Sequence, residues 1–198
     1  GVIGHMEGNK MRMVSTPWQE EKIPFAEAAE LGTRKVIRDH STIGIVVTTD
    51  GSIGDLPRES YESAEERTVN ELKEIGKPFV VVLNTAAPES ELSKGLAEEL
   101  RIKYGVPVLP TDCTHMSADT LNTILGEALN QFPVSQINFY LPGFTEGLEE
   151  EHWIKATIIS ALQEWAGEFS SIDDVKSSIE SLADGEIIES IEVENIDL

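Results

Sequence analysis

The chain has a single cysteine, Cys113, and four scattered histidines among its 198 residues. One cysteine excludes an internal disulfide and is typical of proteins from a reducing compartment. No apolar run approaches the ~20 residues that a membrane-spanning helix needs, and the first residues lack the pattern of a cleavable signal peptide. The histidines show no metal-ligand spacing, so the sequence predicts no metal site. Together these absences favour a cytosolic protein.

Basic residues are scarce beside acidic ones, with 15 Lys and Arg against 36 Asp and Glu and a net charge of −21. Residues 139–198 hold 15 acids and 2 bases, a net of −13, whereas residues 1–138 hold 21 acids and 13 bases, a net of −8. Such a field repels nucleic-acid phosphates and lipid phosphates, so we expect no nucleic-acid partner. The shift predicts two parts, residues 1–135 and residues 136–198. The acidic residues of the second part form either a solvated surface, a surface for basic partners or a surface suited to a metal-rich setting.

Catalytic motifs are also missing. No G-x-x-x-x-G-K-[ST] motif occurs, so these residues contain no phosphate-binding P-loop, and no Asp-x-x-Gly precedes the first helix to hold Mg²⁺. Cys113 and His115 have no assignable Asn or Asp partner, which favours a structural cysteine over a nucleophile. We therefore predict no catalytic residue and no metal ligand in this stretch.

Two apolar, β-branched runs, Ile43–Thr49 and Phe79–Leu83, dominate the first part. Because they are continuous, they predict strands buried on both faces, as in a parallel sheet covered by helices. Residues 60–76 are long enough for a crossover helix, which makes the unit β-α-β. The same alternation continues with helices over residues 90–104 and 117–132 and a short strand over residues 106–110. Ligands of open parallel sheets collect at the carboxyl ends of strands, so the loops TTDGS and NTAAPES are the first candidates for a site.

The flanking regions carry weaker patterns. Residues 11–16 predict a short strand and residues 23–40 a helix, interrupted in its pattern by Gly32. Beyond residue 136 the pattern predicts a second α/β part. Its elements are an edge strand over residues 137–141, helices over residues 149–169 and 173–183, and a period-two strand over residues 186–198.

The most informative loop follows the second buried strand and begins at Asn84. The order of strands and helices is that of the last three strands of a GTPase-like P-loop domain. In such domains an Asn-Lys-x-Asp loop at this position binds guanine. Asn84 occupies the place of that Asn, but Thr85 replaces the Lys and Ala87 the Asp. Without the carboxylate that selects guanine, the loop predicts a nucleotide site that no longer demands guanine. The alternative is that Asn84 only caps a turn.

Two other segments fall where such a domain touches its nucleotide. Thr111, Asp112 and Cys113 follow the third strand and would line the base pocket beside Asn84 and Thr85, unless they simply form a turn before a helix. Ser15 and Thr16 lie in the region of a switch loop that senses the state of the nucleotide.

Four segments, MVSTPW, IPFAEAAELGTRKVI, STIGIVVTTDGSI and ELKEIGKPFVVVLN, resemble the stage IV sporulation protein A family. These are spore-coat morphogenetic ATPases of endospore-forming bacteria. The resemblance covers nearly the whole chain, is dense over Met11–Asn84 and weakens after Gln136. It implies a three-layer α/β sheet of the GTPase-like P-loop NTPase class over residues 1–135, with its N-terminal part missing. Residues 136–198 would then begin an acidic middle domain.

The resemblance also implies a function. The intact protein would bind ATP with Mg²⁺, hydrolyse it, and assemble into a homopolymer that forms the base layer of the spore coat. It would act in the mother-cell cytoplasm at the forespore surface, with itself and other spore-coat proteins as partners and with membrane contact only through regions outside this chain. The P-loop Lys and the Mg²⁺-binding Asp would lie upstream of Gly1, so we expect the chain alone to be inactive. Alternatives are a nucleotide-independent structural assembly module and a GTPase fragment.

Overall fold

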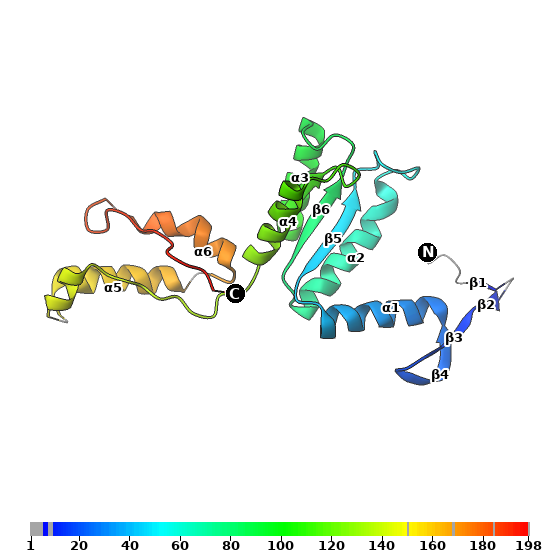
Figure 1. Cartoon of the computed structure of the whole chain (residues 1–198), viewed down its shortest axis with the longest axis horizontal. Helices are drawn as coiled ribbons and strands as arrows, with labels where there is room; N and C mark the ends of the chain where they lie inside the picture. The colour runs from blue at the N-terminus through cyan, green and yellow to red at the C-terminus, as the bar shows by residue number, and fades with distance from the viewer. Residues whose placement is uncertain (1–5, 8–9, 150, 168, 184, 198) are drawn as a thin grey trace.

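We describe a computed structural model of the chain for residues 6–7, 10–149, 151–167, 169–183 and 185–197 (Figure 1). A parallel sheet with helices on both faces forms its centre. An N-terminal region of short hairpins and one helix lies at one end of this sheet, and a helical C-terminal region extends away from it.

The central sheet has the strand order β5-β6-β7 and is parallel throughout. Its strands are β5 (Gly44–Thr49), β6 (Phe79–Asn84) and β7 (Val108–Thr111). The register places Thr49 opposite Asn84 and Asn84 opposite Thr111. The predicted β-α-β unit is therefore confirmed, and the loops after all three strands meet at the end of the sheet where the carboxyl ends of the strands lie.

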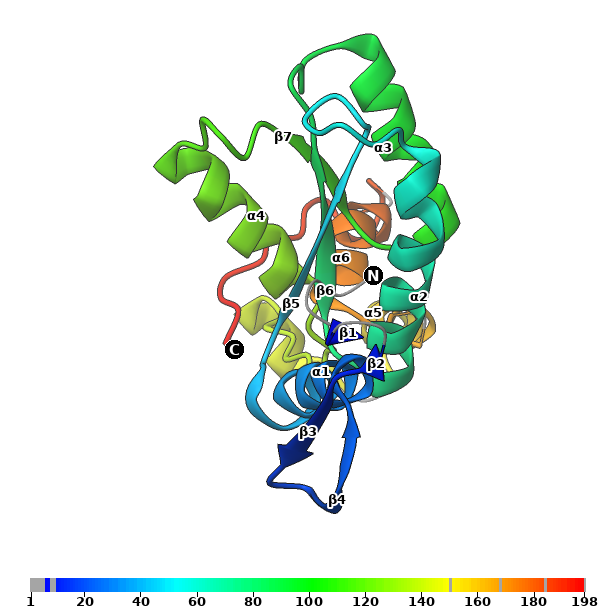
Figure 2. The ribbon, with the colours of Figure 1, turned by 90° about the vertical axis from the view of Figure 1, so that its right-hand side faces the viewer.

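Helices cover both faces of this sheet (Figure 2). On one face, α2 (Glu59–Ile75) and α3 (Glu91–Tyr104) pack against a core that includes Val69, Val81 and Leu100. On the other face, α4 (Ala118–Asn130) packs Ile124 and Ala128 against Val80 and Val82. The ends of these helices follow from the sequence. Ser90 and Ser117 accept hydrogen bonds as N-caps, and Gly76 ends α2 in the left-handed conformation that glycine adopts without strain.

The prediction that both apolar strands are buried on both faces is right for β6 and wrong for β5. Ile45 is 42% exposed and Val47 62% exposed, whereas Val80 to Leu83 are at most 2% exposed. The reason is position, because β5 is an edge strand of the described sheet and its Ile45 and Val47 face stays open. An apolar run predicts burial but does not tell which strand is central.

The N-terminal region contains more strand than predicted. Two antiparallel pairs, β1 (Met6–Glu7) with β2 (Lys10–Met11) and β3 (Met13–Thr16) with β4 (Gln19–Pro24), precede the first helix. The predicted helix is present as α1 (Phe25–Lys35), which continues into a π-helical turn, η1 (Val36–His40). Gly32 does not interrupt α1, and it lies against the Trp18 ring of the hairpin turn.

The C-terminal region is helical. It contains η2 (Gly143–Gly147), α5 (Trp153–Ala166), α6 (Ile172–Ser178) and η3 (Ile179–Leu182), packed around Ile158, Leu162 and Trp165. The strands predicted over residues 137–141 and 186–198 are wrong for the described residues, which join no ladder there; Leu198 lies outside them. Their apolar side chains, among them Ile137, Phe139 and Ile191, pack onto the helices instead. The described residues of this part are helical, and the α/β class predicted for the domain that they would begin stays a prediction.

Candidate functional site

The candidate site lies at the carboxyl ends of the three parallel strands. The register that aligns Thr49, Asn84 and Thr111 brings the loops after β5, β6 and β7 together. These loops contain five residues that the sequence predicts to contact a nucleotide, namely Asn84, Thr85, Thr111, Asp112 and Cys113. The structure brings these five together, and their role in binding stays a prediction.

Asp50 joins the loop after β5 to the loop after β6. Its Oδ2 accepts a hydrogen bond from the Thr85 hydroxyl at 2.6 Å, and its Oδ1 accepts two from Ser52, from the amide at 2.9 Å and the hydroxyl at 2.6 Å. The Ser52 oxygen in turn accepts from the Ala86 amide at 2.9 Å. Partial burial raises the pKa of the Asp50 carboxyl, but the hydrogen bonds together lower this pKa by more than burial raises it. The net shift of the pKa is downward, so Asp50 is ionised at neutral pH.

Thr85 is fully buried, with 0% of its surface exposed. Its hydroxyl bonds to Asp50 and lies 3.0 Å from the Ser93 hydroxyl, which is itself 2.9 Å from that of Ser90. The Thr85 side chain therefore points into the protein, where it holds the loop after β6, and its part in a base pocket stays a prediction. Sequence reasoning pointed to the TTDGS loop, but it did not identify Asp50 and Ser52, because their contact with the next loop depends on how both loops fold.

Asn84 connects the loops after β6 and β7. Its Oδ1 accepts a hydrogen bond from the Cys113 amide at 3.0 Å, and the Thr85 amide donates to the Thr111 carbonyl at 3.0 Å. Asn84 thus bridges to another loop. Cys113 is half-buried, and burial together with the charge of Asp112 raises the pKa of its thiol. A neutral thiol is a poor nucleophile, which agrees with the predicted structural role.

Asp112 folds its own loop. Its Oδ1 accepts from the amides of Thr114 at 2.8 Å and His115 at 3.3 Å, and its Oδ2 lies 2.8 Å from Nδ1 of the exposed His115 ring. The hydrogen bond from His115 is the main cause that lowers the pKa of this carboxyl. The side chain therefore holds the turn that leads into α4.

A buried polar network supports the site from below. Arg58 donates to Glu65 on α2 through both terminal nitrogens, and also to the Thr48 hydroxyl at 2.9 Å and the Thr49 carbonyl at 3.2 Å. The Tyr104 hydroxyl, at the end of α3, donates to Glu65 at 2.7 Å. This network fixes the end of β5 against both helices, and no motif in the sequence indicates it.

Ser15 and Thr16 lie elsewhere. Both are on β3, in the hairpin beside α1, at the opposite end of the sheet from the strand carboxyl ends (Figures 1 and 2). The structure therefore does not bring the two predicted switch residues together with the other predicted site residues. A switch role for Ser15 and Thr16 stays a prediction.

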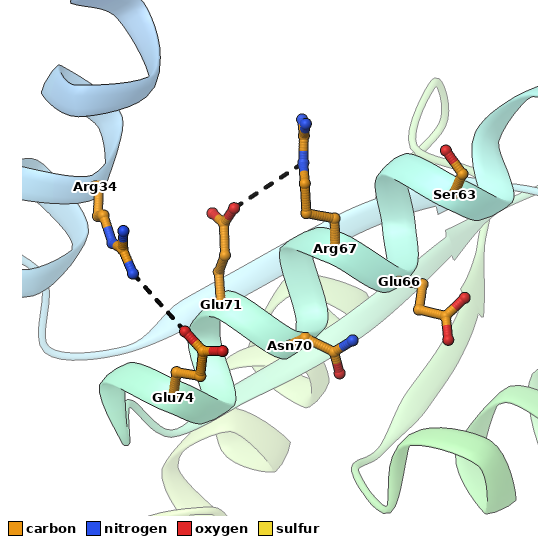
Figure 3. Close-up of a pocket in the computed structure, with 7 residues that line it drawn as sticks. All are labelled: Arg34, Ser63, Glu66, Arg67, Asn70, Glu71 and Glu74. Atoms are coloured by element: carbon orange, nitrogen blue, oxygen red, sulfur yellow. Dashed lines mark ion pairs between the residues drawn. The ribbon is translucent and has the colours of Figure 1, made fainter. Parts of the chain in front are cut away.

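Away from these loops, a groove lies between α1 and the outer face of α2 (Figure 3). Two pairs form within it, Arg34 with Glu74 at 3.7 Å and Arg67 with Glu71 at 4.0 Å, and its Glu66 pairs with Lys103 outside it. None of the predicted site residues lines it. Within the described ranges, no group of three or more His, Cys, Asp or Glu could hold a metal ion.

Two family models together match the whole chain. The ATPase domain of stage IV sporulation protein A matches residues 1–133, and the middle domain of the same protein matches residues 134–198. The chain belongs to the stage IV sporulation protein A family. It is 46% identical to the stage IV sporulation protein A of Clostridioides difficile strain 630 and 42% identical to those of Bacillus subtilis strain 168 and Bacillus anthracis.

These similarities cover 100% of the chain but 40% of each of the three stage IV sporulation A proteins, so the chain spans less than half their length. No solved structure matches the chain. The family resemblance inferred from the sequence is confirmed, and the parallel sheet is compatible with a P-loop-like ATPase domain. The ATPase-domain model ends at residue 133, and the middle-domain model begins at residue 134. The domain boundary that we predict after residue 135 stays a prediction.

Proposed function

We propose that this chain is the base-binding part of a self-assembling ATPase that polymerises on ATP binding or hydrolysis to form the base layer of the spore coat. The observation that carries the proposal is the match of residues 1–133 to an ATPase domain, together with three cross-linked loops at the carboxyl ends of its parallel strands. Ligands of open parallel sheets bind at the carboxyl ends of the strands.

The loops after β6 and β7 supply the base side of the site. The Asn84 bridge to Cys113 and the Thr85 bond to Asp50 hold the two loops in fixed positions. Ala87 stands where a guanine-selecting carboxylate would be, so at this position the loop offers no acidic partner for the guanine edge. We propose that this site accepts the adenine of ATP.

The phosphate side needs residues outside these 198. The sequence contains no P-loop motif, and no described cluster of carboxylates and histidines could hold Mg²⁺. The open edge of β5, with the exposed side chains Ile45 and Val47, leaves room for a further segment of the full-length protein beside the site. We propose that such a segment binds the phosphates and Mg²⁺, and that the 198 residues alone do not hydrolyse ATP.

The second candidate function is a structural assembly module that works without nucleotide. The acidic excess after residue 138 favours it, because a net charge of −13 attracts basic partner surfaces. In this role the chain would contact further copies and other spore-coat proteins at the forespore surface in the mother cell. The described helices include none long and apolar enough to cross a membrane, and we propose that membrane contact occurs through other regions of the full-length protein.

Competition binding separates the two functions. A fluorescent ATP analogue is titrated with the 198-residue chain and with the full-length protein, and ATP and GTP then compete for it. Binding by the full-length protein with ATP ahead of GTP supports the ATPase, whereas GTP equal to or better than ATP points to a GTPase. Sedimentation at increasing concentration completes the test: self-association that ignores ATP supports the module.

A further inference from the structure

Exposed aromatic side chains gather in one short stretch of the C-terminal region. Four aromatic side chains are exposed among the described residues, namely Trp18, Tyr140, Phe144 and Trp153, and the last three are 83%, 63% and 63% exposed. These three lie within residues 140–149 and 151–153, which we call the aromatic tip. The aromatic tip is at the end of α5 that points away from the central sheet (Figure 1). Exposed apolar side chains that gather in one place mark an interaction surface.

Tight turns give the aromatic tip a defined backbone. Thr145 is 3% exposed, and its amide and hydroxyl both donate to the Pro142 carbonyl, at 2.9 and 2.7 Å. Further along, the His152 amide donates to the Glu149 carbonyl at 3.0 Å, and α5 begins directly after it. A surface that is ordered before binding loses less conformational entropy when a partner docks.

The exposed rings are not needed for the core beside them. Phe139 packs edge-on against Trp165 with ring centroids 6.0 Å apart, and Trp165 packs against Phe169 at 4.2 Å. Tyr140, the neighbour of Phe139, is outside this cluster. The described helices of the C-terminal region therefore pack together without the three exposed rings.

Negative charge accompanies these rings. Glu146, Glu149 and Glu151 belong to the aromatic tip and are exposed. In the part of the chain that the structure describes, no basic side chain forms an ion pair with any of the three. Compensating cations are scarce nearby, because residues 139–198 hold 15 acids and 2 bases. The aromatic tip thus combines exposed ring faces with uncompensated carboxylates.

This combination fits a cationic occupant. Arg and Lys side chains bind over the faces of Trp, Tyr and Phe rings, and carboxylates beside the rings attract the same cations. A second copy of this chain would bring a net charge of −21, and lipid and nucleic-acid phosphates are also negative, so electrostatic repulsion disfavours all three. A basic segment of another protein is the partner that the surface fits best.

We propose that the aromatic tip is a docking surface for a basic protein segment. Arg or Lys side chains of that segment lie over the rings of Tyr140, Phe144 and Trp153, and further cations pair with the neighbouring glutamates. This inference rests on the second candidate function, to which it gives a defined surface.

The test titrates fluorescein-labelled octa-arginine with the full-length protein and follows fluorescence anisotropy. We expect Phe144→Ala and Trp153→Ala each to weaken binding by roughly three- to tenfold, because each removes one ring face from the cations. Trp153→Phe keeps an aromatic face and should stay within about twofold of the wild type. Trp18→Ala is the matched control, because Trp18 is exposed but lies in the N-terminal hairpin, and it should leave the affinity unchanged.

Thermal unfolding first shows that each variant is folded. Unchanged affinity of both alanine variants of the aromatic tip would overturn the inference and leave the second candidate function standing. Binding by the 198-residue chain but not by the full-length protein would also overturn it, because another segment then covers the rings. Loss of binding to vesicles of phosphatidylcholine and phosphatidylglycerol in Trp153→Ala would make the surface a membrane contact and overturn it too. A wild-type protein that binds no octa-arginine contradicts the second candidate function itself.

Discussion

At the scale of single residues, the Thr85 hydroxyl connects the loop after β5, the loop after β6 and the start of α3 through hydrogen bonds. It donates to Asp50, accepts from the Ala87 amide and lies within hydrogen-bond distance of Ser93. A buried polar group with all its partners rigidifies its surroundings, and the same group without them destabilises the fold. The loop after β6 is therefore held by its buried side, which leaves its exposed side for a ligand.

Thr85→Val removes this hydroxyl and keeps the shape of the side chain. We expect the free energy of unfolding to fall by about 1–3 kcal/mol, because Asp50 and the Ala87 amide each lose a partner. Urea denaturation measures the change. Thr68→Val is the control, since Thr68 is only half-buried and its hydroxyl bonds only to its own helix, and it should change stability by less than about 0.5 kcal/mol. Equal effects of the two substitutions would contradict the connecting role of Thr85.

Glu65 gives a prediction in pH. Burial raises the pKa of its carboxyl, but hydrogen bonds from Arg58 and Tyr104 lower this pKa by more than burial raises it. The pKa of Glu65 in the folded protein therefore lies below the ordinary 4.5. A depressed carboxyl pKa stabilises the fold above pH 4.5, and this contribution is lost as pH falls through the folded pKa.

Glu65→Gln leaves Arg58 as an unpaired buried charge and should lower stability by about 3 kcal/mol at neutral pH. Unfolding curves of both proteins at several pH values measure this gap, which should shrink as pH falls below 4.5. Glu98→Gln, on an exposed pair with Arg101, is the control and should give no comparable gap. A gap that stays constant through the acid range would contradict the ionised state of Glu65.

At the scale of elements, β5 is the most exposed strand of the central sheet. On the face of the sheet that α2 covers, Val46 of β5 is buried. On the opposite face, Ile45 and Val47 are exposed. Exposed apolar residues on an edge strand are a liability unless another segment covers them. The proposed function assigns that cover to a further segment of the full-length protein.

Val47→Glu tests this cover. In the 198-residue chain Val47 is 62% exposed, so the substitution should change the free energy of unfolding by less than about 1 kcal/mol. In the full-length protein the same carboxylate would be buried, and we expect a loss of more than about 2 kcal/mol. Thermal unfolding of both proteins measures the two effects. Val36→Glu, at an exposed position of η1, serves as the control, and an equal small effect of Val47→Glu in both proteins would contradict the proposed cover.

The elements also show which features the sequence can predict. Long apolar runs and caps carry their own signal, so β6, α2 and the N-cap Ser117 were predictable from local pattern alone. The period-two pattern after residue 185 predicted a strand, but a strand needs a partner, and Ile191 packs onto helices instead. The site divides in the same way: Asn84 follows from its place after a strand, whereas the bond from Thr85 to Asp50 spans 35 residues and depends on the folded loops.

At the scale of the whole molecule, two regions of different character are joined after α4. The first holds the sheet and the candidate site; the second is helical and carries most of the net negative charge, −13 of −21. They meet in a small polar contact, where Lys176 of α6 donates to Asn130 at 2.9 Å and the Ile172 amide donates to the Phe132 carbonyl at 3.0 Å. The first candidate function places nucleotide binding in the region with the sheet, and the second places contacts with partners in the acidic region.

The most direct test is ATP binding by the full-length protein with Asn84→Ala, which breaks the bridge between the two loops proposed to hold the base. Asn130→Ala is the matched control, because Asn130 also makes a side-chain hydrogen bond but lies at the far end of α4. Titration of a fluorescent ATP analogue measures both. We predict that Asn84→Ala weakens ATP binding by about tenfold or more while Asn130→Ala leaves it unchanged. Unchanged ATP affinity in a folded Asn84→Ala protein would contradict a nucleotide site at these strand ends.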